Sequence, residues 1–171
     1  VFVGGALAHN FFVEQGYEIG KSVVSPEKFN LQKYFGDAKL LLPIDMVIKR
    51  GDKVMHIDLG EVEKNDIIVD AGPKTLELLL KAVNSSAQIL WNGTLGLYEQ
   101  GYTEPTIELA KMISESKAKT IVGGGDTLAA IAKLGIEEKF SFVSTGGGAM
   151  LDYLAHETLP AIQAIEKGVD K

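Results

Sequence analysis

The chain contains no cysteine, which excludes disulfide bonds, thiolate metal sites and cysteine redox motifs. It also lacks an excess of basic residues, with 17 Lys and Arg against 23 Asp and Glu and a net charge of -6. A nucleic-acid partner is therefore not expected, because phosphate backbones require clustered positive charge. No apolar run approaches the roughly 20 residues that span a bilayer, and the opening VFVGGALA lacks the basic flank of a signal peptide. The 171 residues, 46% hydrophobic and 23% charged, fit one globular domain of a cytoplasmic protein.

Glycine is abundant, with 19 residues, and it clusters where predicted strands end. The triplets 123–125 and 146–148 and the pair 4–5 each stand between an apolar run and a helical pattern. Such turns expose backbone N–H groups at the positive end of a helix, which makes an anion site. A tight turn with close helix packing is the alternative for any one of them. Three such turns in one chain favour the anion site.

The alternation of strand and helix patterns predicts an α/β fold of the Rossmann-like, three-layer type, with a parallel sheet covered on both faces. The unalternated run at 67–69 fits a strand that is buried on both sides. Residues 51–66 are polar and predict an excursion or hairpin. Strands are expected in 1–3, 67–72, 87–93, 120–125 and 140–148, and extended segments in 39–43 and 45–50. Helices are expected in 6–15, 26–34, 73–83, 103–113, 126–134 and from 149.

The chain begins inside a predicted strand, with no preceding turn or cap. We therefore expect the sheet to be truncated at its N-terminal strand and the chain to belong to something longer. Residues 1–158 are expected to form the domain, and 159–171 a C-terminal tail.

An acid stands beside only one of the triplets, at Asp126. A carboxylate near a helix N-terminus is ordinarily a favourable cap. Beside a phosphate it repels the ligand unless a cation bridges the two, and Mg²⁺ does this by sharing carboxylate and phosphate oxygens. The pattern therefore favours a magnesium nucleotide over a bare phosphate.

The segment WNGTLGLYE at 91–99 supplies two further polar candidates. The Glu99 carboxylate can accept from paired ribose hydroxyls, or it is a solvated loop acid. Asn92 is a turn residue or a donor on the phosphate side. Thr127 can donate to a phosphate, or it is an ordinary residue of a first helical turn.

Two other site types fit poorly. His9, His56 and His156 have no partners at metal-ligand spacing and are expected to be non-catalytic residues of the surface or the edge of the core. A dinucleotide oxidoreductase requires G-x-G-x-x-G and an acid at the end of the next strand. GGGDTL lacks the last glycine, and the next strand ends in Ser144 and Thr145.

Taken together, the motifs resemble the carboxyl-terminal half of the phosphoglycerate kinases. The resemblance covers nearly the whole chain in the order of the family, and the combination of GGGDT, STGGGA and WNG with a following Glu is specific. The matching segments are GYEIGKS at 16–22, LPIDMV at 42–47, WNGTLGLYE at 91–99, IVGGGDTLAA at 121–130 and VSTGGGAMLDYL at 143–154.

This resemblance implies two Rossmann-like domains joined by a hinge. The amino-terminal domain binds 3-phosphoglycerate through a basic patch, and the carboxyl-terminal domain binds Mg-ADP or Mg-ATP. Domain closure then allows phosphoryl transfer between 1,3-bisphosphoglycerate and ADP in glycolysis. The tail at 159–171 would pack on the amino-terminal domain. A full-length enzyme would be monomeric, whereas this chain could associate through an unpaired sheet edge.

The resemblance also implies roles for individual residues. Gly4, Gly5 and Ala6 would lie near the adenine, Val23 and Met46 would wall the base pocket, and Asp126 would hold magnesium through the nucleotide phosphates. The Gly146–Gly148 turn would cradle the transferring phosphoryl group. The implied nucleotide-binding residues are Gly4, Gly5, Val23, Met46, Asn92, Glu99, Gly123, Gly124, Gly125, Asp126 and Thr127, and the implied catalytic residues are Gly146, Gly147 and Gly148.

The chain departs from the family pattern at several points. Thr94 stands where the family usually has proline, Ala6 replaces a third glycine, and AHNF at 8–11 differs from the commoner sequence. The basic substrate patch and the Gly-Ala-Lys strand with its catalytic lysine have no match here. We therefore expect no turnover from this chain alone, and a stand-alone nucleotide-binding module without catalysis is the alternative interpretation.

Overall fold

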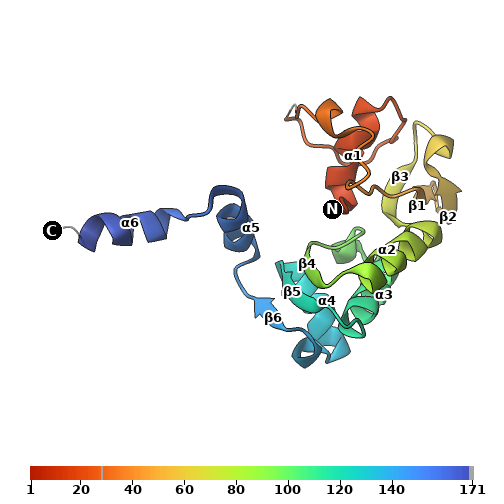
Figure 1. Cartoon of the computed structure of the whole chain (residues 1–171). Coiled ribbons are helices and arrows are strands. Elements are labelled where there is room, and N and C mark those ends of the chain that lie inside the picture. The colour runs from red at the N-terminus through yellow and green to blue at the C-terminus, as the bar shows by residue number, and fades with distance from the viewer. Residues whose placement is uncertain (28, 170–171) are drawn as a thin grey trace.

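The fold is of the α/β class, as a computed structural model describes it for residues 1–27 and 29–169. Two three-stranded sheets form the body, and the last two helices lead away from it (Figure 1). The helices are α1 Gly5–Glu14, α2 Pro73–Ser85, α3 Glu104–Ser114, α4 Gly125–Leu134, α5 Gly147–His156 and α6 Pro160–Val169. The strands are β1 Asp45–Arg50, β2 Lys53–Asp58, β3 Ile67–Ala71, β4 Gln88–Asn92, β5 Lys119–Gly123 and β6 Phe142–Ser144.

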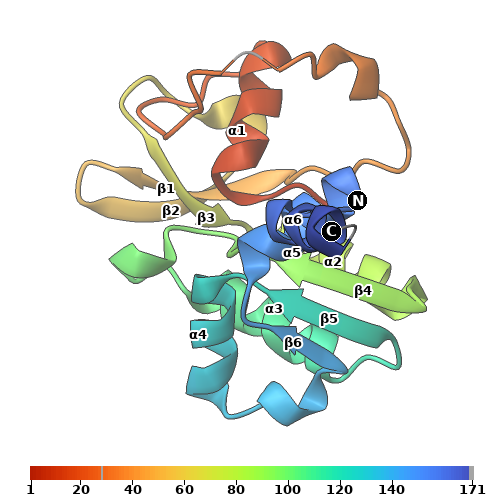
Figure 2. The same cartoon turned by 90° about the vertical axis from the view of Figure 1, so that its left-hand side faces the viewer.

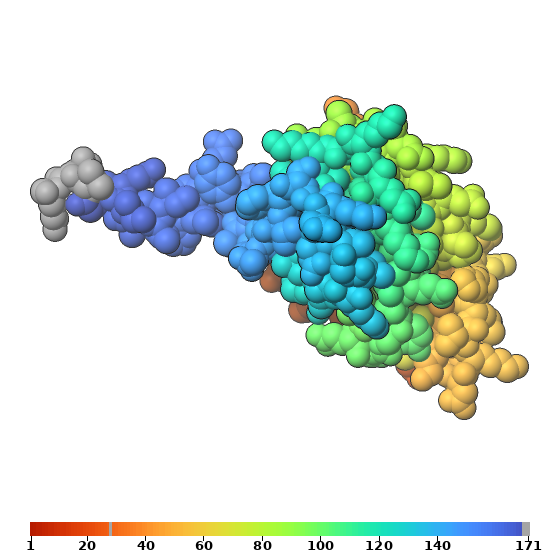
Figure 3. All heavy atoms as spheres, turned by 90° about the horizontal axis from the view of Figure 1, so that it is seen from below, coloured from red at the N-terminus to blue at the C-terminus, as the bar shows by residue number. Residues whose placement is uncertain are grey.

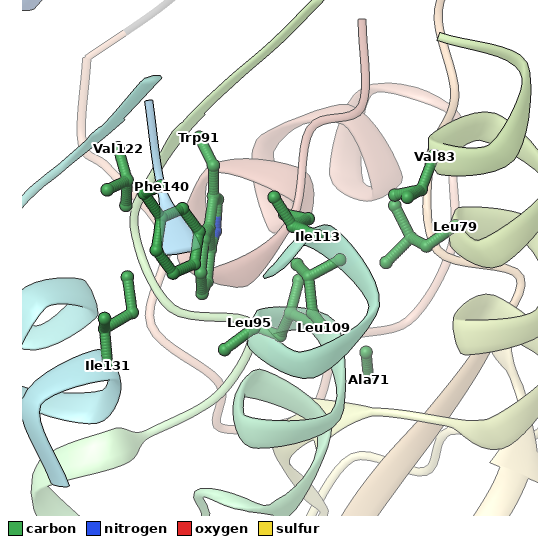
Figure 4. Close-up of a cluster of buried hydrophobic side chains, with 11 residues drawn as sticks. Ala71, Leu79, Val83, Trp91, Leu95, Leu109, Ile113, Val122, Ile131 and Phe140 are labelled. Carbon is green, nitrogen blue, oxygen red and sulfur yellow. The ribbon is translucent and has the colours of Figure 1, made fainter. Parts of the chain in front are cut away.

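One sheet is parallel, with strand order β4-β5-β6, and it confirms the predicted α/β architecture. Helices α2, α3 and α4 bury their apolar faces against this sheet and share one core with it. In α2, for example, Leu79 and Val83 stand one helical turn apart and point into the same cluster (Figure 4). The buried members of this first core are Ala71, Leu79, Val83, Trp91, Leu95, Leu109, Ala110, Ile113, Val122, Ile131 and Phe140.

The other sheet is antiparallel, with order β2-β1-β3. Residues 51–66 include the β1–β2 turn and β2, so the hairpin expectation is confirmed. The run 67–69 is largely buried as expected, but β3 pairs antiparallel with β1 and lies outside the parallel sheet. Figure 2 shows this sheet beside α1 and above the parallel sheet. The second core consists of Ala8, Phe12, Ile19, Met46, Ile48, Val62 and Ile68.

The predicted strand at 1–3 is reduced to a single parallel bridge, which joins Phe2 to Leu41 in the segment 39–43 that was expected to be extended. The predicted helix at 26–34 is wrong, because within the described residues of this range (26–27 and 29–34) only the 3₁₀ turn Gln32–Tyr34 forms. Ser25 uses its hydroxyl to accept from the Glu27 N–H, while its carbonyl accepts from Asn10 Nδ2 at 3.2 Å. The bond to Asn10 ties the segment to α1, while the bond between Ser25 and Glu27 stays within a local turn.

A buried junction between Asp45 and Thr75 connects the two sheets. Asp45 begins β1, and its Oδ1 accepts from Thr75 N at 2.8 Å and from Thr75 Oγ1 at 2.7 Å. Its Oδ2 accepts from Lys74 N at 3.0 Å, so one carboxylate satisfies two free N–H groups of the first turn of α2. A Cβ on Gly72 would lie 2.3 Å from this carboxylate, so the residue before α2 has room for glycine alone.

The two C-terminal helices project from the body (Figures 1 and 3). Leu154 of α5 and Ile165 of α6 are 56% and 67% exposed. The last two residues of the expected tail, 170 and 171, lie outside the described residues, and the packing of 159–171 on another domain stays a prediction. None of the helices in the described ranges is long and apolar enough to cross a membrane.

Replacement of Thr75 by valine tests the junction. The side chain is fully buried, and its hydroxyl also accepts from Ile44 N at 3.0 Å. Thr75→Val keeps the shape but leaves buried polar groups without partners, so we expect a loss of about 2 kcal/mol in the free energy of unfolding, measured in urea.

Thr103→Val is the matched control. Thr103 is the N-cap residue of α3, but its side chain makes no capping hydrogen bond within the described structure. An equal loss in both variants would show that the Asp45–Thr75 contact adds no stability of its own.

Candidate functional site

The starts of three helices meet around the loop 93–97 that follows β4. Gly5 begins α1 with φ +58°, and a Cβ there would lie 3.2 Å from the Thr94 carbonyl oxygen. Gly124 precedes α4, and Gly147 begins α5 against it. A Cβ on Gly147 would lie only 2.4 Å from Gly124 N, closer than any side chain permits. Glycine therefore allows the three backbones to converge on one loop.

Hydrogen bonds fix the end of β4 between α4 and α5. Asn92 Nδ2 donates to the Gly147 carbonyl at 3.2 Å, and Gly93 N donates to Thr127 Oγ1 at 2.9 Å. Trp91, the preceding core residue, donates from Nε1 to the Gly93 carbonyl at 2.8 Å. Asn92, the two glycine triplets and Thr127 are thus brought together, as the sequence predicts for residues at strand ends.

The predicted polar residues differ in their exposure. Asp126 lies exposed in the first turn of α4, and Glu99 lies exposed in the 3₁₀ turn Tyr98–Gln100. Thr127 is fully buried, and its hydroxyl is bonded to Gly93 behind the loop. Among residues 1–27 and 29–169, no three His, Cys, Asp or Glu side chains cluster in a way that could hold a metal ion.

A cavity of about 210 Å³ opens between α1, β3 and the loop 93–97. Its volume is below the roughly 300 Å³ of pockets for drug-sized ligands, so it suits a single ring system. Gly5 and Val23 line it, whereas Met46 lines an adjoining void of about 10 Å³. The lining residues are Gly5, Ala6, His9, Val23, Ile67, Ile68, Val69, Asp70, Thr94, Leu95, Gly96 and Leu97.

Asp70 is a cavity residue that the sequence analysis missed. It is 3% exposed at the end of β3, and burial raises the pKa of its carboxyl to about 7, with a smaller contribution from the negative charge of Glu104. Oδ1 accepts from Ala71 N at 2.9 Å, but Oδ2 has no hydrogen-bond partner in the described part of the chain. The sequence signal that could have identified Asp70 is an acidic residue directly after the apolar run 67–69 of a buried strand.

His9 is the second such residue. It is 6% exposed, and its Nδ1 lies 2.6 Å from the Val23 carbonyl oxygen. Burial lowers the pKa of the imidazole despite this hydrogen bond, so the ring is neutral at pH 7. Its place at the edge of the core agrees with the expectation, while its contact with the cavity was not foreseen.

Comparison with known proteins gives consistent matches. The family model described as phosphoglycerate kinase matches residues 1–157. Phosphoglycerate kinases of Borrelia garinii and Leptospira biflexa are 36% and 38% identical over 98% and 96% of this chain. The phosphoglycerate kinase structure from Coxiella burnetii has a TM-score of 0.85 at 36% identity over 97% of the chain, and that from Pyrococcus horikoshii has 0.79 at 30% over all of it.

These matches cover 44–46% of each relative, so the chain spans slightly less than half of their length. The residues matched by the family model include the three glycine turns, the loop 93–97 and the cavity. The chain belongs to the phosphoglycerate kinase family.

Proposed function

We propose that this chain is the nucleotide-binding half of a phosphoglycerate kinase and that it holds Mg-ADP or Mg-ATP for phosphoryl transfer with 1,3-bisphosphoglycerate or 3-phosphoglycerate. The observation that supports this most is the meeting of three glycine-led helix starts at one loop, next to a cavity of about 210 Å³. Helix starts attract anions, and the cavity suits a base. One site therefore offers complementary environments to both ends of a nucleotide.

The base would enter the cavity with Gly5 and Ala6 on one side and Leu97 on the other. Val23, which is 64% exposed, stands at its open side. Gly4 precedes α1 and lines neither the cavity nor the void. Its proposed role is to let α1 begin close to the base, because a Cβ there would lie 2.7 Å from Phe2 Cε1 and 3.3 Å from Leu95 Cδ2, and Leu95 lines the cavity.

The phosphates would lie over the starts of α4 and α5. Gly123, Gly124 and Gly125 lead into α4, and the Gly146–Gly148 turn leads into α5, so backbone N–H groups at both starts can donate to phosphate oxygens. Asn92 and Thr127 hold this geometry through their bonds to Gly147 and Gly93. Phosphoryl transfer depends mainly on positioning and charge stabilisation, which such N–H groups supply at the transferring group.

The residues present fit a magnesium ion that arrives with the nucleotide. A single exposed carboxylate, Asp126, lies in the first turn of α4, and the described residues form no cluster of three ligands. Mg²⁺ commonly takes one or two carboxylates and completes its shell with phosphate oxygens and water. Asp126 would hold the ion, which offsets phosphate charge, and Glu99 would accept from the ribose hydroxyls.

Replacement of Asp126 by alanine tests the metal role. Because the carboxylate is exposed, its loss leaves the fold unchanged. We expect Asp126→Ala to weaken Mg-ADP at least about tenfold, since even outer partners of metal ligands are worth that much, while ADP in EDTA changes little. Isothermal titration calorimetry with and without Mg²⁺ measures both.

Asp52→Ala, in the β1–β2 turn, is the control for a lost surface charge. If Asp126→Ala weakened ADP equally with and without magnesium, the carboxylate would not be a ligand of the ion.

The second test is turnover. We expect none from these 171 residues with 3-phosphoglycerate and ATP, because the implied basic patch and catalytic lysine have no match in the sequence. A coupled assay of ADP release measures this, with a complete phosphoglycerate kinase as the positive control. Measurable turnover that scales with the concentration of the chain would contradict the proposal that this chain is only the nucleotide-binding half of the enzyme.

A further inference from the structure

Residues 96 and 97 cover the end of β3, and two contacts hold them there. Leu97 N donates to the Val69 carbonyl at 2.8 Å. Gly96 lies directly on the next side chain of the strand, because a Cβ at Gly96 would come within 2.2 Å of Asp70 Cγ. The second half of the loop 93–97 therefore rests on a buried carboxyl group.

The first half of the same loop is bonded elsewhere. Gly93 N donates to Thr127 Oγ1 of α4 at 2.9 Å, and Leu95 N donates to Thr106 Oγ1 of α3 at 3.0 Å. Both threonines are fully buried. Residues 96 and 97 can thus leave β3 while the loop as far as Leu95 keeps its bonds.

The enclosure of Asp70 suits a neutral carboxyl better than a charged one. Only 3% of the residue is exposed, and Oδ1 accepts from Ala71 N at 2.9 Å. Oδ2 has no hydrogen-bond partner among the described residues. Burial of an unpaired charge costs more than burial of a neutral polar group. Ionisation therefore favours a state in which the carboxylate reaches water, and Gly96 is part of its cover.

The neighbouring elements do not offset a negative charge on Asp70. Their titratable residues are His9 of α1, Asp45 and Lys49 of β1, Tyr98 and Glu99 of the 3₁₀ turn and Glu104 of α3, and the loop 93–97 has none. Glu104 disfavours ionisation of Asp70, and the His9 ring is neutral at pH 7. The Asp45 carboxylate is bonded to N–H groups of α2, and Glu99 is exposed. Burial, with a smaller contribution from Glu104, raises the pKa of Asp70 to about 7.

We propose that Asp70 is a pH-sensitive latch for residues 96 and 97: its neutral form holds them on β3, and its ionised form releases them. The latch requires no bound nucleotide, so it is independent of the proposed function. It would nevertheless act on the proposed site, because Leu97 lines the cavity and Glu99 follows in the next turn.

The latch responds to pH between two limits. In the closed state the pKa of Asp70 is about 7, whereas in the open state water returns it toward the ordinary carboxyl value of about 4. Between these values the closed state binds the additional proton, so the open fraction increases by up to about tenfold per pH unit as the pH rises. Above about pH 7 both states are ionised, and the open fraction levels off.

Amide hydrogen exchange of Leu97 tests this, followed by NMR at pH 5, 6, 7 and 8 and corrected for intrinsic exchange, because it measures the open fraction. We expect that fraction to rise about tenfold from pH 5 to 6 and only about twofold from pH 7 to 8. Low concentrations of urea should leave the exchange unchanged, since a local opening exposes little surface whereas global unfolding responds steeply.

Three variants accompany the wild type. Asp70→Asn is uncharged at every pH, so its open fraction should not depend on pH in this range. Glu104→Gln removes a charge that disfavours ionisation, so its profile should level off at a lower pH. Asp52→Asn, in the β1–β2 turn, is the control for loss of a surface carboxylate and should keep the wild-type profile.

Exchange of Leu97 that responds to urea as global unfolding does would show that residues 96 and 97 do not open by themselves, and it would overturn the latch. A flat wild-type profile, or a wild-type slope retained in Asp70→Asn, would overturn it too. If circular dichroism shows that Asp70→Asn is unfolded, Glu104→Gln decides, and an unshifted profile contradicts the proposal. Failure of the chain to bind ADP would overturn the proposed function and leave the latch unaffected.

Discussion

The contact between the backbones of Gly147 and Gly124 is the constraint on which the candidate site depends. Any side chain at position 147 would collide with Gly124 N, so α5 can begin against the turn before α4 only if that side chain is absent. The contact places the N–H groups of two helix starts on one side of the sheet, where Asn92 joins them. The anion site that we propose here would be made mainly from backbone geometry, and charged side chains would only supplement it.

The cavity lies where the two sheets meet, and this explains its composition. Ile68 and Asp70 come from β3 of the antiparallel sheet, whereas Leu95 and Leu97 come from the loop after β4 of the parallel sheet. The Asp45–Thr75 junction joins these parts through α2, so the walls of the cavity depend on buried hydrogen bonds some distance from it. Boundaries between packed units commonly provide such pockets, because neither core fills them.

Sequence reasoning predicted the elements around the glycine turns well, because hydrophobic runs and glycine act locally. It predicted Asp126 in the first turn of α4, where the structure has it. It failed at 26–34, where Ser25 and Pro26 indicate a helix start but contacts to Asn10 hold a turn. Asp70 was missed for a related reason: its missing partner becomes visible only when β3 and Gly96 are packed together. Properties that arise from tertiary contacts have no local signature.

Trp91 has a consequence for how the molecule can be observed. It is the single tryptophan of the chain, 7% exposed, and its indole N–H is bonded to the Gly93 carbonyl at the start of the loop that closes the cavity. Indole emission shifts with hydrogen bonding and polarity around the ring. When excitation is selective for tryptophan and leaves the five tyrosines unexcited, the emission of this chain comes from Trp91 alone, and it reports rearrangement of the loop 93–97 without any label.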